Sequence, residues 1–336
     1  MRTHLFLYIC IMKQIVRTLI VAMCALCTVT VAQARGRRHE VTVVSNHEQV
    51  KIYSSAVEDT LRIFVIADTH LWLSDEREEP YREYSQRMAA AYHVTSHFRT
   101  GAATNPEQAF RQTVALAKAR GADVVALVGD ILSYPSERGV EFVQEVMQQA
   151  GLKYYYTCGN HDWHYEGMPG SSHDLRKRWR EERLKPLFQG YDPDGYGVTE
   201  KGVRLLFVDS SNYLIEPQQL QFIRQQVRRG EPFILFQHIP MYAPSRPVGY
   251  GIGHPDWGRK ADGGYNIERR EPWAESHTQV DYDYYDAIVE APNLLATFAG
   301  HVHNYGCDQI NGRAHFTVGA SFSAAYYEVV VMPMKR

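Results

Sequence analysis

The sequence predicts an α/β protein, and two patterns carry this prediction. Short apolar runs that contain Val, Ile and Leu, which are typical of buried strands, recur along the chain. Amphipathic stretches with helix start and stop signals lie between several of them. Because strands that alternate with helices form βαβ units, we expect largely parallel pairing and a ligand site at the carboxyl ends of the strands.

The expected strands are short and mostly apolar. Val41–Ser45 and Val50–Tyr53 predict a first hairpin, and Leu61–Ala67, with the sequence LRIFVIA, predicts a buried strand. The same pattern recurs further along the chain. It predicts strands at Asp123–Val128, Lys153–Thr157, Val203–Val208, Phe233–Gln237, Leu294–Phe298, Ala314–Val318 and Ala325–Met332.

Three segments carry helix signals. Asn105 is suited to an N-cap, Pro106 to the first helical position, and Gly121 to the residue after the end. Two further helices each precede a glycine, which favours a C-terminal cap. They are Glu137–Ala150 before Gly151 and Pro217–Arg229 before Gly230.

The first 34 residues predict a secretory signal peptide. Lys13 and Arg17 precede the uncharged run 18–32, and Ala32-Gln33-Ala34 fits an A-x-A cleavage site. Met12 begins a more typical signal than Met1, which makes it an alternative start. The run is shorter than the roughly 20 residues of a membrane span, so an uncleaved anchor helix is the less favoured alternative.

Residues 35–336 are therefore expected to form a single exported domain, periplasmic or secreted, with no transmembrane span in the mature chain. The formal net charge is −2, and residues 1–34 contain basic residues but no acidic one, so nucleic-acid binding is not expected. Outside this segment only Cys158 and Cys307 remain. They are either a disulfide pair or two separate thiols.

Polar side chains follow five of the expected strands. Because the carboxyl ends of parallel strands share one edge of a sheet, we expect them to lie together. Carboxylate, imidazole and amide groups without thiolate suit Mn, Fe, Zn, Ni or Co. The candidate residues, in chain order, are Asp68 and His70, Asp130, Asn160 with His161 and Asp162, His238, and His301 with His303.

The number of candidate ligands exceeds what one tetrahedral site needs. A carboxylate such as Asp130 can bridge two ions about 3.5–4 Å apart, which clamp the attacking and leaving oxygens of a phosphoryl displacement. Each piece alone has an ordinary explanation: Asp68 as a helix cap, Gly129-Asp130 as a turn, His238 as a core histidine. Only His301-x-His303 is moderately specific by itself, but the ordered set favours a dinuclear metal site.

This ordered set resembles the calcineurin-like metallophosphoesterase superfamily. Its blocks are Asp68-x-His70, Gly129-Asp130, Gly159-Asn160-His161-Asp162, His238 and Gly300-His301-x-His303, and they span about residues 60–305. The resemblance implies a four-layer α/β/β/α sandwich with the site at one edge. It also implies two divalent metal ions, with Mn, Fe and Zn as candidates.

The resemblance further implies a role for each residue. Asp68, His70 and His303 would hold the first ion, and Asn160, His238 and His301 the second, with Asp130 as the bridge. His161 would stabilise the developing charge or protonate the leaving oxygen without binding a metal. A metal-bound hydroxide would attack the phosphate ester in line.

Departures from known branches narrow the choice. Ser133 stands where purple acid phosphatases have Tyr, and Asp162 stands where serine/threonine phosphatases have Glu. Asp162 resembles the cyclic-nucleotide phosphodiesterase branch.

We expect hydrolysis of a small-molecule or lipid phosphate ester, either a phosphodiester or a phosphomonoester. The alternatives are a non-enzymatic scaffold on this fold and a hydrolase of pyrophosphate or lipid headgroup phosphodiester bonds.

Two inserted loops are expected, near 71–100 and 242–280. The second is rich in aromatic and charged residues, so it is either a substrate-contacting roof or an ordinary surface loop. A basic stretch, Arg176–Lys185, follows the Asn160 loop. Its alternating charges favour a solvated helix face over an anion-attracting surface.

Overall fold

A computed structural model describes residues 38–88, 91–244, 246, 251–254 and 277–334. The predicted signal peptide, residues 1–34, lies outside this part of the chain, as does most of the predicted loop 242–280. Residues His39–Arg336 belong to one compact unit.

The first of two large sheets has six strands. Their order across the sheet is β1 (Val41–Ser45), β2 (Gln49–Ser54), β14 (Tyr327–Pro333), β3 (Leu61–Ile66), β6 (Val124–Val128) and β7 (Tyr154–Thr157). The pairs β2–β14, β3–β6 and β6–β7 are parallel, whereas β1–β2 and β14–β3 are antiparallel. The predicted first hairpin therefore forms the outer edge of this sheet.

The second sheet also has six strands. Their order is β12 (Gly306–Ile310), β13 (Arg313–Thr317), β11 (Leu294–Ala299), β10 (Phe233–Phe236), β9 (Val203–Val208) and β8 (Gly195–Glu200). Its four central strands are parallel, and β8 and β12 add antiparallel edges. The expected parallel pairing thus holds for the four central strands of the second sheet and for β3, β6 and β7 of the first, whereas the central pair β14–β3 and the edge pairs of β1, β8 and β12 are antiparallel.

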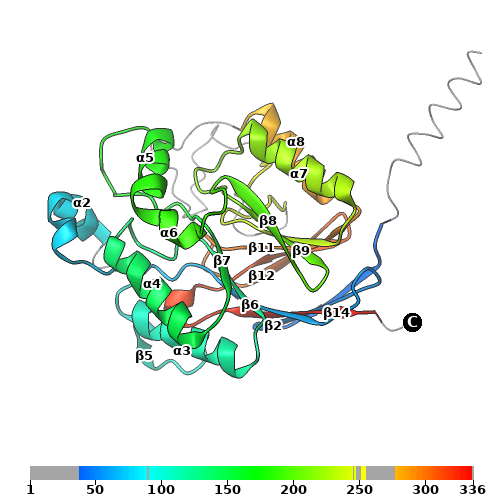
Figure 1. Ribbon diagram of the computed structural model, residues 1–336, viewed down its shortest axis with the longest axis horizontal. Coiled ribbons are helices and arrows are strands. Elements are labelled where there is room, and N and C mark those ends of the chain that lie inside the picture. The colour runs from blue at the N-terminus through cyan, green and yellow to red at the C-terminus, as the bar shows by residue number, and fades with distance from the viewer. Residues whose placement is uncertain (1–37, 89–90, 245, 247–250, 255–276, 335–336) are drawn as a thin grey trace, which may run out of the picture. The chain divides into compact units, whose positions relative to one another are not determined.

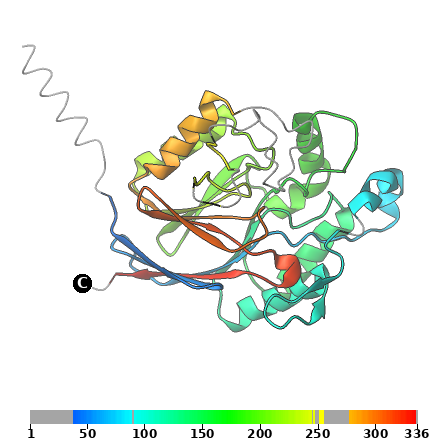
Figure 2. The same ribbon diagram turned by 180° about the vertical axis from the view of Figure 1, so that it is seen from behind.

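The two sheets pack face to face, and helices cover their outer faces (Figures 1 and 2). Along β3, Ile63 and Val65 join the core between the sheets, whereas Phe64 and Ile66 join the core under the helices. This alternation is the two-residue period of a strand that is buried on both faces. The fold is therefore the four-layer α/β/β/α sandwich that the sequence led us to expect.

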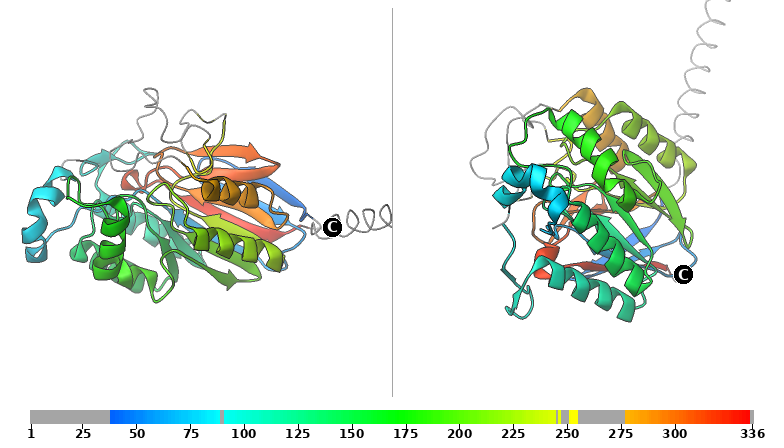
Figure 3. Two further views of the ribbon diagram at one scale, coloured as in Figure 1. Left: turned by 90° about the horizontal axis from the view of Figure 1, so that it is seen from above. Right: turned by 60° about the vertical axis from the view of Figure 1, so that its left-hand side comes forward.

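The main helices lie on opposite sides of the sheet pair, α3 and α4 on one and α7 and α8 on the other (Figure 3). Their bounds are Pro106–Ala119 for α3, Glu137–Ala150 for α4, Pro217–Arg229 for α7 and Gln279–Val289 for α8. The predicted caps form: Asn105 accepts from the Gln108 amide, and Gly151 adopts φ 65°. Gly230 ends α7 with φ 74° in the same way.

Several elements were missed by the sequence patterns, and their composition explains why. The edge strands β8 (GYGVTE) and β12 (GCDQI) are half-exposed, so they lack the apolar run that marks a central strand. In contrast, the helix predicted for the basic stretch Arg176–Lys185 is present, as α5 (Ser172–Trp179), one π-helical segment (Arg180–Leu184) and α6 (Lys185–Phe188).

The prediction of a solvated face for this stretch is wrong for Arg176 and Arg180. Arg176 is 3% exposed and lies 3.4 Å from the Asp209 carboxylate, and Arg180 contacts the same carboxylate at 2.7 Å. Because Asp209 follows β9, these ion pairs connect α5 and the π-helical segment to the end of a central strand. Arg178 and Lys185 remain exposed and pair with Glu182 and Glu181 on the same helical stretch.

The segment 71–100 contains short elements rather than a regular helix. These are two 3₁₀ helices (Glu76–Tyr81 and Gln86–Met88), the short helix α2 (Arg82–Ser85) and β4 (Thr95–Ser96), which pairs with β5 (Ala103–Thr104). Arg77 binds Asp75 and reaches Glu137 and Glu141 of α4 at 2.8 and 2.6 Å. The segment is therefore fastened to the sandwich by an ion-pair network.

Cys158 is buried and Cys307 is exposed on β12, and both are free thiols. The disulfide alternative is therefore wrong for this structure. Among the helices of the described ranges, none has both the length and the apolar character that crossing a bilayer requires.

The core between the sheets contains an aromatic stack that can be tested. Phe298 is fully buried, and its ring centroid lies 5.8 Å from that of Phe236 and 5.0 Å from that of Phe316. Replacing it with Ala leaves a cavity and should lower the free energy of unfolding by roughly 3–5 kcal/mol. Denaturant unfolding measures this. Val44→Ala, at an exposed edge position (57% exposed), is the control, and equal midpoints for the two variants would contradict this account of the core.

Candidate metal centre

The predicted site residues come from the ends of five strands, but these strands belong to two sheets. Asp68 and His70 follow β3, Asp130 follows β6, and Asn160 and His161 follow β7, all in the first sheet. His238 follows β10, and His301 and His303 follow β11, in the second sheet. The expectation of one sheet edge is therefore wrong, because the site forms where the edges of two packed sheets meet.

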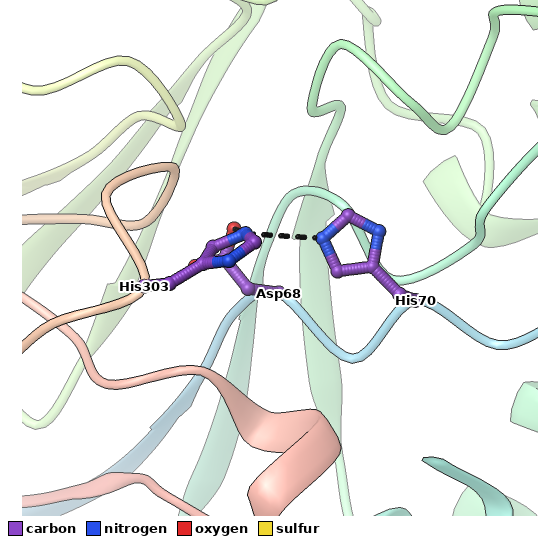
Figure 4. Close-up of side chains that lie close together, drawn as sticks. All are labelled: Asp68, His70 and His303. Atoms are coloured by element: carbon purple, nitrogen blue, oxygen red, sulfur yellow. Dashed lines mark hydrogen bonds and ion pairs between the residues drawn. The ribbon is translucent and has the colours of Figure 1, made fainter. Parts of the chain in front are cut away.

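Asp68, His70 and His303 form a first group. One ligand atom of each lies within 4.8 Å of the others. The Nε2 atoms of His70 and His303 are 3.2 Å apart, and His303 Nε2 lies 3.4 Å from Asp68 Oδ1 (Figure 4). Two imidazole nitrogens and a carboxylate that converge in this way suit a divalent cation.

Asp130, His238 and His301 form a second group within the same distance limit. Asp130 Oδ2 lies 3.1 Å from His238 Nε2 and 3.8 Å from His70 Nε2. A single carboxylate oxygen therefore faces ligands of both groups. The other ring nitrogen of His238, Nδ1, donates to the Val128 carbonyl at 3.0 Å, which turns Nε2 toward the site.

Asn160 and His161 lie at the same place. The His161 backbone amide donates to Asp130 Oδ1 at 2.7 Å, and its ring can share a site with His70 and Asp130. His161 is 8% exposed, and Asn160 is buried. All seven predicted ligand residues and His161 therefore come from loops that meet at this edge of the sandwich.

Several buried polar atoms in these loops have no hydrogen-bond partner among the described residues. They include Asn160 Oδ1, His238 Nε2 and His301 Nε2. A buried polar atom without a partner is costly, so such atoms usually signal a missing ligand, ion or water. An amide oxygen and an imidazole nitrogen are both metal-binding atoms, and the residues present therefore fit a divalent metal ion.

Burial and neighbouring charges lower the pKa values of some histidines of the site and raise the pKa of another. Burial, together with the nearby His161, holds the pKa of His70 well below its ordinary value, and burial beside His238 does the same for His301. Burial also acts to lower the pKa of His238, but the charge of Asp130 outweighs it and raises that pKa to about 9. A lowered pKa favours the neutral imidazole, which has a lone pair available to a metal.

Backbone strain is concentrated at these residues. A non-glycine residue with positive φ is uncommon, and such strain clusters at functional sites. Five of the seven candidate ligands adopt it: Asp68 (55°), His70 (51°), Asp130 (49°), His301 (72°) and His303 (56°).

Three glycines let the loops approach closely enough to form the site. A Cβ on Gly159 would collide with Asp130 Oδ1, and one on Gly300 would lie 2.7 Å from Asp68 Oδ2. A Cβ on Gly129 would lie 2.6 Å from the Gly159 amide and from the His238 ring. Each glycine of the motif blocks is therefore required by a neighbouring ligand.

Asp162 supports the loops. Its Oδ1 accepts from the Leu132 amide and its Oδ2 from the Gly159 amide, each at 2.7 Å. Burial, together with the charge of Asp130, raises its pKa to about 7. The sequence left open whether Asp162 orients His161; the structure shows it joining the loops after β6 and β7 through their backbones.

Three aromatic side chains complete the surroundings. Tyr134 donates through its hydroxyl to the Leu73 carbonyl at 2.8 Å. Tyr92 and Phe322, which the sequence analysis did not single out, border His70 and His303. Tyr92 lies in an inserted segment without a regular hydrophobic period, so no signal in the sequence pointed to it.

Solved structures resemble this chain at low identity. A dimetal phosphatase from Danio rerio is 14% identical, with a TM-score of 0.49, over 79% of this chain and 91% of that one. A purple acid phosphatase from yellow lupin is 12% identical (TM-score 0.44), over 81% of this chain and 47% of that one. A putative 5'-nucleotidase from Staphylococcus aureus is 13% identical (TM-score 0.43), over 79% and 49%.

A search of curated proteins returned no match. The family model of the calcineurin-like phosphoesterases, in contrast, matches residues 61–305, which is most of the chain and includes every candidate ligand. The chain therefore belongs to the calcineurin-like phosphoesterase family and is a metal-dependent phosphoester hydrolase.

Proposed function

We propose that the chain is an exported phosphohydrolase with a dinuclear metal centre. Asp68, His70 and His303 would hold one ion, and Asn160, His238 and His301 would hold the other. Asp130 would serve both. The observation that carries this assignment is the position of Asp130 Oδ2, which lies 3.8 Å from His70 Nε2 of one group and 3.1 Å from His238 Nε2 of the other.

When bound, the two ions supply a nucleophilic water at neutral pH and stabilise charge on the phosphoryl oxygens. The protein supplies the orientation. Asp130 Oδ1 fixes the His161 backbone, so the imidazole of His161 is held beside the reacting group. From there it donates a hydrogen bond to the phosphoryl oxygen or a proton to the leaving oxygen.

We propose a small-molecule or lipid phosphate ester as substrate. The full set of candidate ligands disfavours the scaffold alternative, because a protein that had only kept the fold would not need strained metal-binding residues. Export, which rests on residues 1–34, favours a substrate outside the cytoplasm, including a lipid headgroup phosphodiester or a pyrophosphate. Mn, Fe and Zn are the candidate metals.

Two substitutions test the mechanism. Asp130→Asn removes the negative charge of the proposed bridging group, and we expect the variant to lose bound metal and at least about a hundredfold of kcat/KM. His161→Ala removes a donor to the transition state and should lower kcat by roughly 100- to 1000-fold with metal retained. Elemental analysis gives the metal content, and bis-p-nitrophenyl phosphate and p-nitrophenyl phosphate give the rates.

The two readouts separate the possible outcomes. A metal content near two ions per wild-type chain, together with measurable turnover, supports the dinuclear site. The ratio of the rates on the two substrates then assigns diester or monoester preference. A wild-type protein that stays metal-free and inactive after Mn, Fe or Zn is supplied would place the scaffold alternative first.

A glycine substitution tests the close packing of the centre. Gly159→Ala places a methyl group against Asp130 Oδ1, so the carboxylate must move, and we expect at least a roughly tenfold loss of kcat/KM together with reduced metal content. Gly195→Ala is the matched control, because its Cβ would meet Phe222 at an ordinary 3.5 Å. Equal activity of both variants would contradict the proposed position of Asp130.

The export proposal has a separate test. After expression of the full chain in a Gram-negative host, mass spectrometry of the periplasmic fraction should find an N-terminus at Arg35. Changing Lys13 and Arg17 to Glu removes the basic start of the signal and should retain the chain in the cytoplasm. An uncleaved wild-type chain in the membrane fraction would instead favour the anchor-helix alternative.

A further inference from the structure

Side-chain exposure shows where a substrate reaches the metal centre. The side chains of His70 and His238 are 0% exposed and that of Asp130 is 1% exposed, whereas that of His303 is 26% exposed. Asp68, the nearest carboxylate to His303, is also 0% exposed. His301 is half-buried as well, so a phosphate ester approaches the buried ligands past His301 and His303.

Tyr92 lies beside this approach. Its ring centroid is 4.2 Å from that of His70 and 5.2 Å from that of His303. It also stacks on Phe322, at 4.8 Å between centroids and 21° between ring planes. Both residues are half-buried. Together they form an aromatic wall at the edge of the site, and part of the surface of this wall is exposed to solvent.

The backbone holds this wall in place from two directions. Phe322 donates its amide to the Asp68 carbonyl at 3.0 Å, so the ring is fixed to the loop that carries a candidate ligand. The inserted segment is joined to Phe322 in turn, because Thr95 Oγ1 donates to the Phe322 carbonyl at 2.8 Å. Tyr92 itself has φ 58°, a strained value for a bulky aromatic residue.

We propose that Tyr92, supported by Phe322, is a specificity-determining residue that contacts the organic group of the substrate. This inference rests on the proposed function and deepens it. An ester whose phosphate lies on the metal centre has its organic group next to phosphorus, at the position of the aromatic wall. A planar aromatic group there stacks on the Tyr92 ring in the same way that Phe322 does, so the preferred substrates are phosphate esters with an aromatic group adjacent to the phosphate.

Binding of two phosphonates distinguishes substrate contact from simple support of His70. Phenylphosphonate and methylphosphonate share the anionic group and differ in the ring. Calorimetric titration of the metal-loaded wild-type protein should show tighter binding of phenylphosphonate. Tyr92→Ala should weaken phenylphosphonate roughly two- to tenfold, the range for an aromatic pair, and change methylphosphonate by less than about twofold.

Three further variants complete the test. Tyr92→Phe keeps the ring and should retain the preference, and Tyr92→Leu keeps apolar bulk without a ring and should lose it even if the alanine variant folds poorly. Tyr191→Ala removes an exposed tyrosine that stacks on Tyr196, and it should leave both affinities unchanged. Metal content is measured for each variant.

Equal weakening of both phosphonates in Tyr92→Ala, or loss of metal in Tyr92→Leu, would overturn the inference and leave Tyr92 as a support for His70. A wild-type protein that hydrolyses esters without preferring phenylphosphonate would overturn it as well. A wild-type protein that neither hydrolyses an ester nor binds methylphosphonate would overturn the proposed function and, with it, this inference.

Discussion

The carboxylate of Asp130 is the group on which the rest of the site depends, because its two oxygens face different parts of the molecule. Oδ1 accepts the His161 amide and so joins the loops after β6 and β7. Oδ2 faces His70 in the first sheet and His238 in the second. A single buried side chain therefore lies against residues from both sheets. The way in which the two sheets pack consequently sets the distances between the candidate ligands.

Such a site has a cost in stability that the surrounding fold must offset. Positive φ values at non-glycine residues cost of order 1–3 kcal/mol each, and Asp68, Asp130 and His301 all adopt them. The centre is nonetheless held by well-packed elements, because nearly all residues of the strands that precede these loops are buried between two apolar layers. Asp162 also accepts two short hydrogen bonds from backbone amides next to the candidate ligands. Bound cations would contribute further by satisfying Asn160 Oδ1 and His301 Nε2.

The sequence predicted the central strands and the capped helices because burial on both faces and capping leave local signals. It also named the candidate ligands that follow β3, β6, β7, β10 and β11. It could not predict that the strands divide between two sheets, because local patterns do not tell which strands pair. The edge strands β8 and β12 were missed for lack of apolar runs, and the buried pairs of Arg176 and Arg180 with Asp209 were missed because burial of a charge depends on a partner far along the chain.

The use of the motif-block side chains as candidate ligands implies that substrate selectivity comes from residues outside these blocks. At the ends of β3, β6, β7, β10 and β11, the candidate ligands would be occupied by metal in the proposed centre, and Asp162 binds neighbouring backbone amides, so few side chains there remain to contact the organic part of an ester. Tyr92 lies in the segment 71–100, which Arg77 fastens to α4 and Thr95 fastens to Phe322. A segment fixed at both of these points can present a ring beside His70 without altering the ligand loops. Substrate preference can therefore change through this insertion while the metal centre stays the same.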